Sequence, residues 1–189
     1  MPGVPSAMYL NTLNPLKGWP SPTAVDFSGK LSANVTVKPV NAGRVVHVAS
    51  ILNNVPQLEL GCIGPQMAIF LFQSSLDFDV SNPGVVGDYT YGISPKGISS
   101  GLVAAGAYEL ETTEFDQTRQ YLPNQPLRSP ASNTDAVNGG ILTNQGIGVN
   151  ASGTFANAIC GCVSRGVYKN AYQQQALAFW PVYFPHPTA

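Results

Sequence analysis

Charge is what this sequence has least of. Only 10% of its 189 residues are Asp, Glu, Lys or Arg, and the formal net charge is −1. An ordinary globular domain carries about 25% charged residues and places most of them on its surface. Residues 136–164 contain no charged side chain, and none follows Lys169. Such a composition is typical of a chain built for an assembly, in which neighbouring protein surfaces replace water.

The missing charges and the missing long apolar runs exclude several classes of protein. No basic patch or acidic tail is present, so nucleic acid is not an expected partner. A membrane-spanning helix needs about 20 predominantly apolar residues, and the best candidate, Leu60–Leu76, is interrupted by glycine, proline and glutamine. The N-terminus lacks the positively charged segment of a secretory signal. We therefore expect no membrane partner, and a protein that stays in solution in the compartment where it is made.

Cysteine and histidine are also scarce. Cys62, Cys160 and Cys162 form an odd count without the spacing of a disulfide framework, so we expect small, buried, free thiols. A metal site would have to recruit them together with His47 from distant strands. We therefore predict neither a metal site nor a bound cofactor.

Motifs for catalysis are missing as well. The sequence contains no nucleophile elbow and no zinc-protease motif. Acidic pairs occur at Asp77 and Asp79 and at Glu109 and Glu111, and either pair is conceivable as a catalytic acid and base. Asp77 and Asp79 would share one strand face, so a calcium site is conceivable there as well. Without a visible cluster of partner residues we favour solvated strand faces or loop mouths for both pairs. We therefore predict that the protein is not an enzyme and has no catalytic residues.

Proline and glycine are concentrated near the N-terminus. Residues 1–28 contain seven of them and show no periodicity, which predicts an extended arm followed by one β-rich domain over residues 29–189. The arm also carries apolar residues and would gain order by lying on another surface. It either adds to the sheet edge of a partner or folds back on its own domain.

Short strand patterns separated by Gly/Pro turns fill the rest of the chain. Leu31–Val40 and Arg44–Ala49 flank a glycine-bearing loop and predict a hairpin, and Met67–Phe72 predicts a buried strand. The proline inside Ala176–Phe184 predicts a strand at a sheet edge or a bulge. Thr113–Gln120 is the one stretch that favours a helical turn. The predicted fold class is all-β: a single β-sandwich or barrel-like domain with long loops and very little helix.

A family resemblance rests on five short segments. They are VNAGRVVHV at Val40–Val48, LVAAGAYELETTEF at Leu102–Phe115, GGILT at Gly139–Thr143, ICGCVSRGV at Ile159–Val167 and LAFWP at Leu177–Pro181. Their succession resembles the capsid decoration (cement) proteins of tailed double-stranded DNA bacteriophages. That family is β-rich, binds the outside of the expanded head and bridges neighbouring capsid subunits.

The resemblance implies a structural virion protein without cofactor. It would be made in the host cytoplasm and would lie on the capsid exterior, with the major capsid protein as its partner and a trimer or dimer as its own oligomer. Two alternatives stay open: a head-fibre or tail module with a shallow carbohydrate site lined by Trp, Tyr and Asn, and a viral tail or shell subunit that assembles alone.

Large apolar residues near the two ends of the chain are the predicted interface anchors, because aromatic side chains often dominate interfaces. Trp180 has the alternative of an ordinary core position. The anchors are Tyr9, Leu10, Leu13 and Trp19 in the arm, and Trp180, Tyr183 and Phe184 near the C-terminus.

Overall fold

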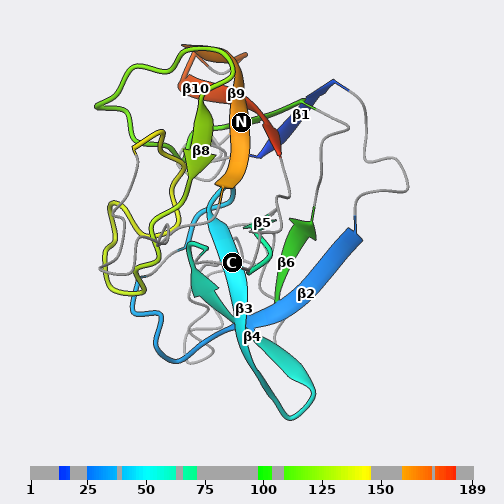
Figure 1. Ribbon diagram of the computed structural model, residues 1–189. Helices are drawn as coiled ribbons and strands as arrows, with labels where there is room; N and C mark the ends of the chain where they lie inside the picture. The colour runs from blue at the N-terminus through cyan, green and yellow to red at the C-terminus, as the bar shows by residue number, and fades with distance from the viewer. Residues whose placement is uncertain are drawn as a thin grey trace, which may run out of the picture.

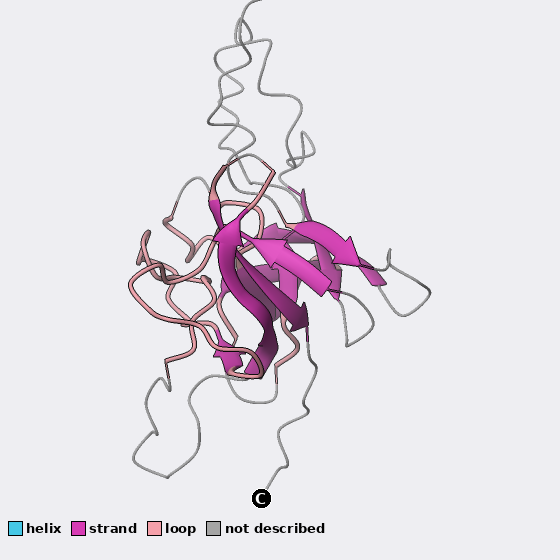
Figure 2. Cartoon of the chain, turned by 90° about the horizontal axis from the view of Figure 1, so that it is seen from above, coloured by secondary structure: helices cyan, strands magenta, loops and turns pink. Residues whose placement is uncertain are grey.

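The fold is built from strands and loops. The computed structural model describes residues 13–17, 25–37, 40–62, 66–71, 98–103, 109–145, 159–171 and 173–181. Every regular element in these ranges is a strand, and they contain no helix (Figure 2). The predicted all-β class is therefore confirmed.

Five strands close into a barrel in the order β2-β4-β3-β5-β6 (Figure 1). The parallel pair is β2 with β4, and the other neighbours run antiparallel. The predicted buried strand within Met67–Phe72 is confirmed as β5. The barrel strands are β2 (Val25–Leu31), β3 (Val45–Leu52), β4 (Val55–Leu60), β5 (Ile69–Leu71) and β6 (Ile98–Val103).

The other five strands form an antiparallel sheet in the order β1-β7-β10-β9-β8. The sequence predicts that the C-terminal strand lies at a sheet edge or at a bulge. The edge alternative is wrong, since β10 lies between β7 and β9, whereas an irregularity in its pairing with β9 fits the bulge alternative. Its register with β9 shifts at a bulge between Ala178 and Phe179, and Pro181 is its last residue, where a missing N–H is tolerated. The strands are β1 (Asn14–Lys17), β7 (Glu109–Thr112), β8 (Pro126–Arg128), β9 (Ile159–Lys169) and β10 (Gln175–Pro181).

The hairpin predicted around residues 41–43 is wrong. Strand β2 ends at Leu31 and residues 32–37 form turns and loop, so β3 pairs with β4 instead. Asn53 and Asn54 connect these two strands with φ angles of 51° and 62°. Asparagine tolerates this left-handed region better than other side chains, and two such residues in succession suit the tight turns that join antiparallel strands.

The helical turn predicted at Thr113–Gln120 is also wrong. Phe115 forms a β-bridge with Leu142, and the Asp116 carboxylate accepts a hydrogen bond from the backbone N–H of Thr118 at 3.0 Å. This side-chain contact closes a local turn and competes with helix formation, as acidic and hydroxyl residues commonly do.

Two hydrophobic clusters form the core of the described residues. Alternation along β5 separates them, because Phe70 packs between barrel and sheet whereas Ile69 and Leu71 lie inside the barrel. The interlayer cluster comprises Leu13, Val45, Cys62, Phe70, Leu110, Phe115, Tyr121, Leu127, Leu142, Cys160, Val163, Leu177 and Phe179. The barrel cluster comprises Val35, Val37, Val40, Val46, Leu58, Leu60, Ile69 and Leu71.

Part of the predicted arm lies on its own chain. Strand β1 adds to the sheet edge beside β7, and residues 25–28 of β2 pair with β6. These stretches follow the fold-back alternative. Residues 1–12 and 18–24 are outside the described part of the chain, so the arm boundary at residue 28 stays a prediction.

Candidate functional site

The predicted interface anchors fall on different parts of the molecule. Leu13 is buried in the interlayer cluster and therefore contributes to the fold of its own chain. Trp180 is half-buried on β10, where it pairs with Cys162 of β9. The anchors that lie outside the described residues are Tyr9, Leu10, Trp19, Tyr183 and Phe184.

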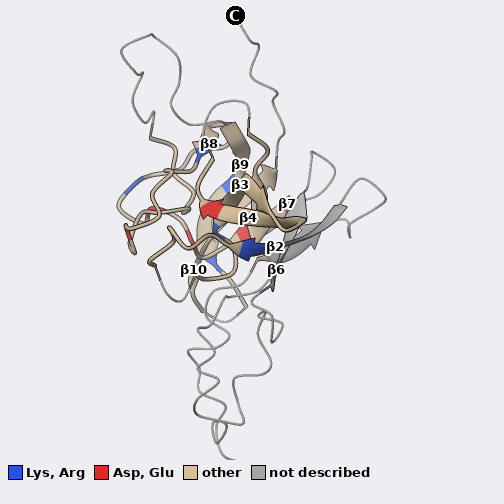
Figure 3. Cartoon of the chain, turned by 90° about the horizontal axis from the view of Figure 1, so that it is seen from below, with Lys and Arg blue, Asp and Glu red and all other residues tan. Residues whose placement is uncertain are grey.

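Several of the few charged side chains are inside the fold. The chain has nine basic and ten acidic residues, and at least five of these are buried. Figure 3 shows how sparsely the charged positions are spread over the described ribbon. The exterior therefore carries even less charge than the composition suggests. The buried five are Arg44, Glu109, Glu111, Glu114 and Arg128.

One buried ion pair joins the two layers. Arg44 precedes β3 of the barrel, Glu114 follows β7 of the sheet, and Arg44 Nε donates to Glu114 Oε2 at 2.7 Å. The other guanidinium nitrogens donate to the carbonyl oxygens of Gly139 at 2.9 Å and Ala136 at 2.8 Å. Asn41 donates to the second carboxylate oxygen at 3.2 Å. Because both charges are paired and hydrogen-bonded, this cluster is a structural clamp.

The Glu109 and Glu111 carboxylates are held across a strand. Arg165 of β9 donates to Glu109 through Nε at 2.7 Å and through Nη2, and Tyr168 donates its hydroxyl to Glu111. Strand β10 lies between β7 and β9, and its residue Ala178 is the register partner of Glu111. The small alanine leaves room for the long side chains to meet. Burial, together with the contact to Glu111, raises the pKa of Tyr168.

The contact between Arg165 and Glu109 compensates for the burial of the carboxylate. Glu109 is almost fully buried, whereas 51% of the Arg165 side chain is exposed, so the arginine covers the carboxylate from the surface. The expectation that this acidic pair forms a solvated strand face is wrong, since both carboxylates are buried. Asp77 and Asp79 lie outside the described residues.

The cysteines are free thiols, as predicted. Cys62 and Cys160 are buried in the interlayer cluster, and Cys62 donates its thiol to the Gln66 carbonyl oxygen at 3.0 Å. A hydrogen bond with Cys62, followed by burial, raises the pKa of Cys160. Burial also raises the pKa of Cys162. A thiol with a raised pKa stays protonated near neutral pH and reacts slowly, which favours packing as the role of Cys160 and Cys162.

His47 is accounted for by packing as well. Its ring is buried, and Nδ1 donates to the Gly61 carbonyl oxygen at 2.8 Å. Within the described residues, no three His, Cys, Asp or Glu side chains are grouped so as to hold a metal ion. The same ranges contain no helix long and apolar enough to cross a membrane.

The hairpin tip, defined as residues 51–56, exposes apolar side chains. Ile51 is 70% exposed and Leu52 is 61% exposed. They pair with Pro56 and Val55 across the hairpin, and partners in a register pair share a face, so both faces of the tip are apolar. Figure 1 shows that the β3–β4 hairpin extends beyond the rest of the described fold. An exposed apolar protrusion of this kind is typical of a contact surface.

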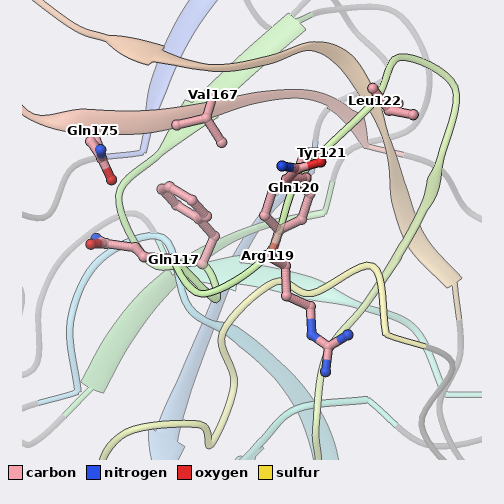
Figure 4. Close-up of a pocket in the computed structure, with 8 residues that line it drawn as sticks. Gln117, Arg119, Gln120, Tyr121, Leu122, Val167 and Gln175 are labelled. Atoms are coloured by element: carbon pink, nitrogen blue, oxygen red, sulfur yellow. The ribbon is translucent and has the colours of Figure 1, made fainter.

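A hollow of about 380 Å³ lies between the loop after β7 and the strands β9 and β10 (Figure 4). Phe115 and Tyr121 form its base and are packed edge to face with ring centroids 5.6 Å apart. Both rings are buried, and burial raises the pKa of Tyr121 to about 12. Its lining residues are Phe115, Gln117, Arg119, Gln120, Tyr121, Leu122, Val167 and Gln175. We call this feature the loop hollow.

The rim of the loop hollow is apolar and amide-rich. Leu122 is 62% exposed and Val167 is also exposed, and three exposed glutamines line other parts of the hollow. Among the described lining residues Arg119 is the charged one, and its Nε donates to the Asp116 carboxylate at 3.0 Å. The hollow therefore presents little unpaired charge.

Comparisons with known proteins give no relative. No family model matches the chain, no curated protein matches it, and no solved structure matches it.

Sequence reasoning missed both surfaces and the clamp. The Asn53-Asn54 pair between apolar neighbours was the available signal for the hairpin tip. No local signal joins Arg44 to Glu114, because 70 residues separate them.

Proposed function

We propose that this chain is a bacteriophage capsid decoration protein. It binds the outer surface of the expanded head and stabilises it by bridging neighbouring subunits of the major capsid protein. The observation that carries the proposal is the combination of a surface poor in charge with exposed apolar side chains. Low surface charge and exposed apolar side chains reduce the solubility of a protein that functions as a monomer. In a protein that contacts neighbouring subunits, the same surface is buried in the interface.

The cost of burying charge and the gain from burying apolar area also favour a role in an assembly. Unpaired charges are costly to bury, so an uncharged, amide-rich surface loses less on contact with a capsid. Apolar burial stabilises by about 25 cal/mol per Å² before the costs of association. Each contact can be modest, because repetition around a closed shell multiplies its effect through multivalency.

Co-sedimentation tests the proposal. Purified protein is mixed with expanded heads and, separately, with unexpanded heads of its phage, and the pellets are analysed. The expected result is protein in the pellet of expanded heads only. Attachment should also persist in about 1 M salt, because few exposed charges are available for screening. Absence of the protein from both pellets would overturn the proposal.

The arm can be tested separately. A deletion of residues 1–28 would remove β1 and the start of β2, so residues 2–12 are the appropriate deletion. It removes Tyr9 and Leu10 and leaves Leu13 in the core. We expect an unchanged thermal midpoint and weaker attachment to expanded heads. Unchanged attachment would remove this part of the arm from the mechanism.

The carbohydrate-binding alternative has less support. Sugars stack on exposed aromatic faces, whereas the rings of the loop hollow are buried at its base. Its three glutamines offer hydrogen bonds, but Trp180 does not line it. Binding of the isolated protein to a glycan array would restore this alternative.

A further inference from the structure

Two exposed surfaces of this chain, one protruding and one recessed, carry the same kinds of side chain. The hairpin tip is a narrow protrusion with Ile51 and Leu52 exposed, and the loop hollow is a recess with Leu122 and Val167 exposed. All four of these apolar side chains are exposed to solvent in the described structure. Apolar side chains left in water at a protrusion and at a recess are stabilised when one enters the other.

The polar groups of the two surfaces also match. The turn of the hairpin tip carries the exposed amides of Asn53 and Asn54, and the hollow carries those of Gln117, Gln120 and Gln175. Side-chain amides both donate and accept hydrogen bonds, so the two sets can satisfy each other without charge.

Charge does not oppose the contact. No charged residue lies between His47 and Glu59 in the hairpin. On the other side, Arg119 is bound by Asp116 and points away from the other lining residues in Figure 4.

Geometry excludes contact within one chain. The hairpin tip lies at one end of the described fold, whereas the β9–β10 connection beside the hollow lies at the opposite end (Figure 1). The two surfaces are different patches, so a contact between two copies is head-to-tail. Each copy in such a contact keeps one free tip or one free hollow for a further neighbour.

We infer that the hairpin tip of one copy docks in the loop hollow of a second copy of this chain. The contact propagates head to tail, and it forms a ring where the rotation between copies closes and a filament where it does not. A two-residue turn covers less than the roughly 800 Å² per partner of a stable interface, so the tip sets the register of a contact that neighbouring surface completes. This contact joins copies of the chain to one another and does not require the capsid.

Complementation between two variants tests this contact without any capsid. The tip variant carries Ile51→Asp and Leu52→Asp, and the hollow variant carries Leu122→Asp. The matched control is Val137→Asp, since Val137 is 73% exposed and belongs to neither surface. Each protein is examined by sedimentation velocity over a range of concentrations, and circular dichroism melting checks its fold.

We expect the wild type and the control to associate alike and each surface variant to be monomeric. A mixture of the tip and hollow variants should form dimers and nothing larger, because it retains one intact tip and one intact hollow. A symmetric interface between identical patches would not be rescued in this way. If a variant melts early, Ile51→Ser with Leu52→Ser and Leu122→Ser replace the aspartates.

Three results would overturn the inference. They are a wild type that remains monomeric at all concentrations, a tip or hollow variant that associates like the wild type, and a mixture that stays monomeric. Capsid attachment by a monomeric wild type would leave the proposed function standing while removing this contact.

Discussion

The barrel interior and the interlayer region are built on different principles. Among the residues whose burial the structure describes, the barrel cluster consists of Val, Leu and Ile, whereas the interlayer cluster includes three phenylalanines, a tyrosine and two thiols. The Arg44–Glu114 pair spans the same two layers. Aliphatic packing tolerates exchange of side chains of similar volume, while aromatic contacts and buried ion pairs need one geometry. The barrel interior therefore contributes general stability, and the interlayer region fixes how the sheet packs on the barrel.

The largest expected effect comes from breaking the ion pair. Arg44→Met leaves the Glu114 carboxylate buried without its cation, and it leaves the carbonyl oxygens of Ala136 and Gly139 without a donor. We expect a loss of about 3–5 kcal/mol in the free energy of unfolding, measured by urea denaturation. The double variant Arg44→Met with Glu114→Leu should recover part of this loss. A single variant as stable as the wild type would show that the clamp does not hold the layers.

Truncation in the interlayer cluster should have a comparable effect. Phe179 is fully buried and packs against Phe70 with ring centroids 5.4 Å apart. Phe179→Ala should destabilise the fold by about 3–5 kcal/mol in the same assay. Phe179→Leu, which keeps much of the volume, is the control and should cost less. Equal costs for the two would mean that the cavity relaxes and that the aromatic packing is not specific.

A conservative exchange in the barrel should be much milder. Leu58 is fully buried and contacts the backbone of Gly29, where an added Cβ would lie 2.9 Å from it. Leu58→Met keeps the volume with a more flexible side chain, so we expect a cost below about 1.5 kcal/mol. Thermal melting followed by circular dichroism measures it. A cost equal to that of Phe179→Ala would erase the contrast between the two regions.

The smallest expected effect is on the pH dependence of stability, and it comes from Asp135. The backbone N–H of Asn138, followed by its side-chain amide, holds the pKa of Asp135 below its ordinary value, and the backbone N–H of Val137 adds to this. An Asp in an unfolded chain titrates near pH 3.9. Its stabilising contribution is therefore complete above about pH 4 and is lost as the pH falls through the lower folded pKa.

Asp135→Asn tests this contribution. The thermal midpoint of the variant should be slightly lower at pH 7, and it should fall less steeply than that of the wild type between about pH 4 and pH 2. The Asp135 loop also supplies the Ala136 carbonyl oxygen that Arg44 uses. Identical pH profiles for variant and wild type would show that the Asp135 carboxylate does not contribute to stability.

Local patterns account for much of the fold. Gly/Pro punctuation and short apolar runs predicted the all-β class, because side-chain alternation and turn chemistry are local properties. Val35 and Val37, which belong to the segment predicted as a strand, are buried in the barrel cluster although they lie in a loop. The predicted strand pairing is wrong, because the tight turn forms at Asn53-Asn54 and not at residues 41–43. Strand β3 therefore pairs with β4.

What the sequence by itself determined is the low charge, the β-strand content, the free thiols and the presence of a buried core. The tertiary structure alone decided which charges are inside and which apolar residues are outside. Arg44 and Glu114 meet because two layers fold together, and Ile51 and Leu52 stay exposed because their hairpin extends past the barrel. The physical reason is that burial depends on contacts between distant segments, and composition does not specify these contacts.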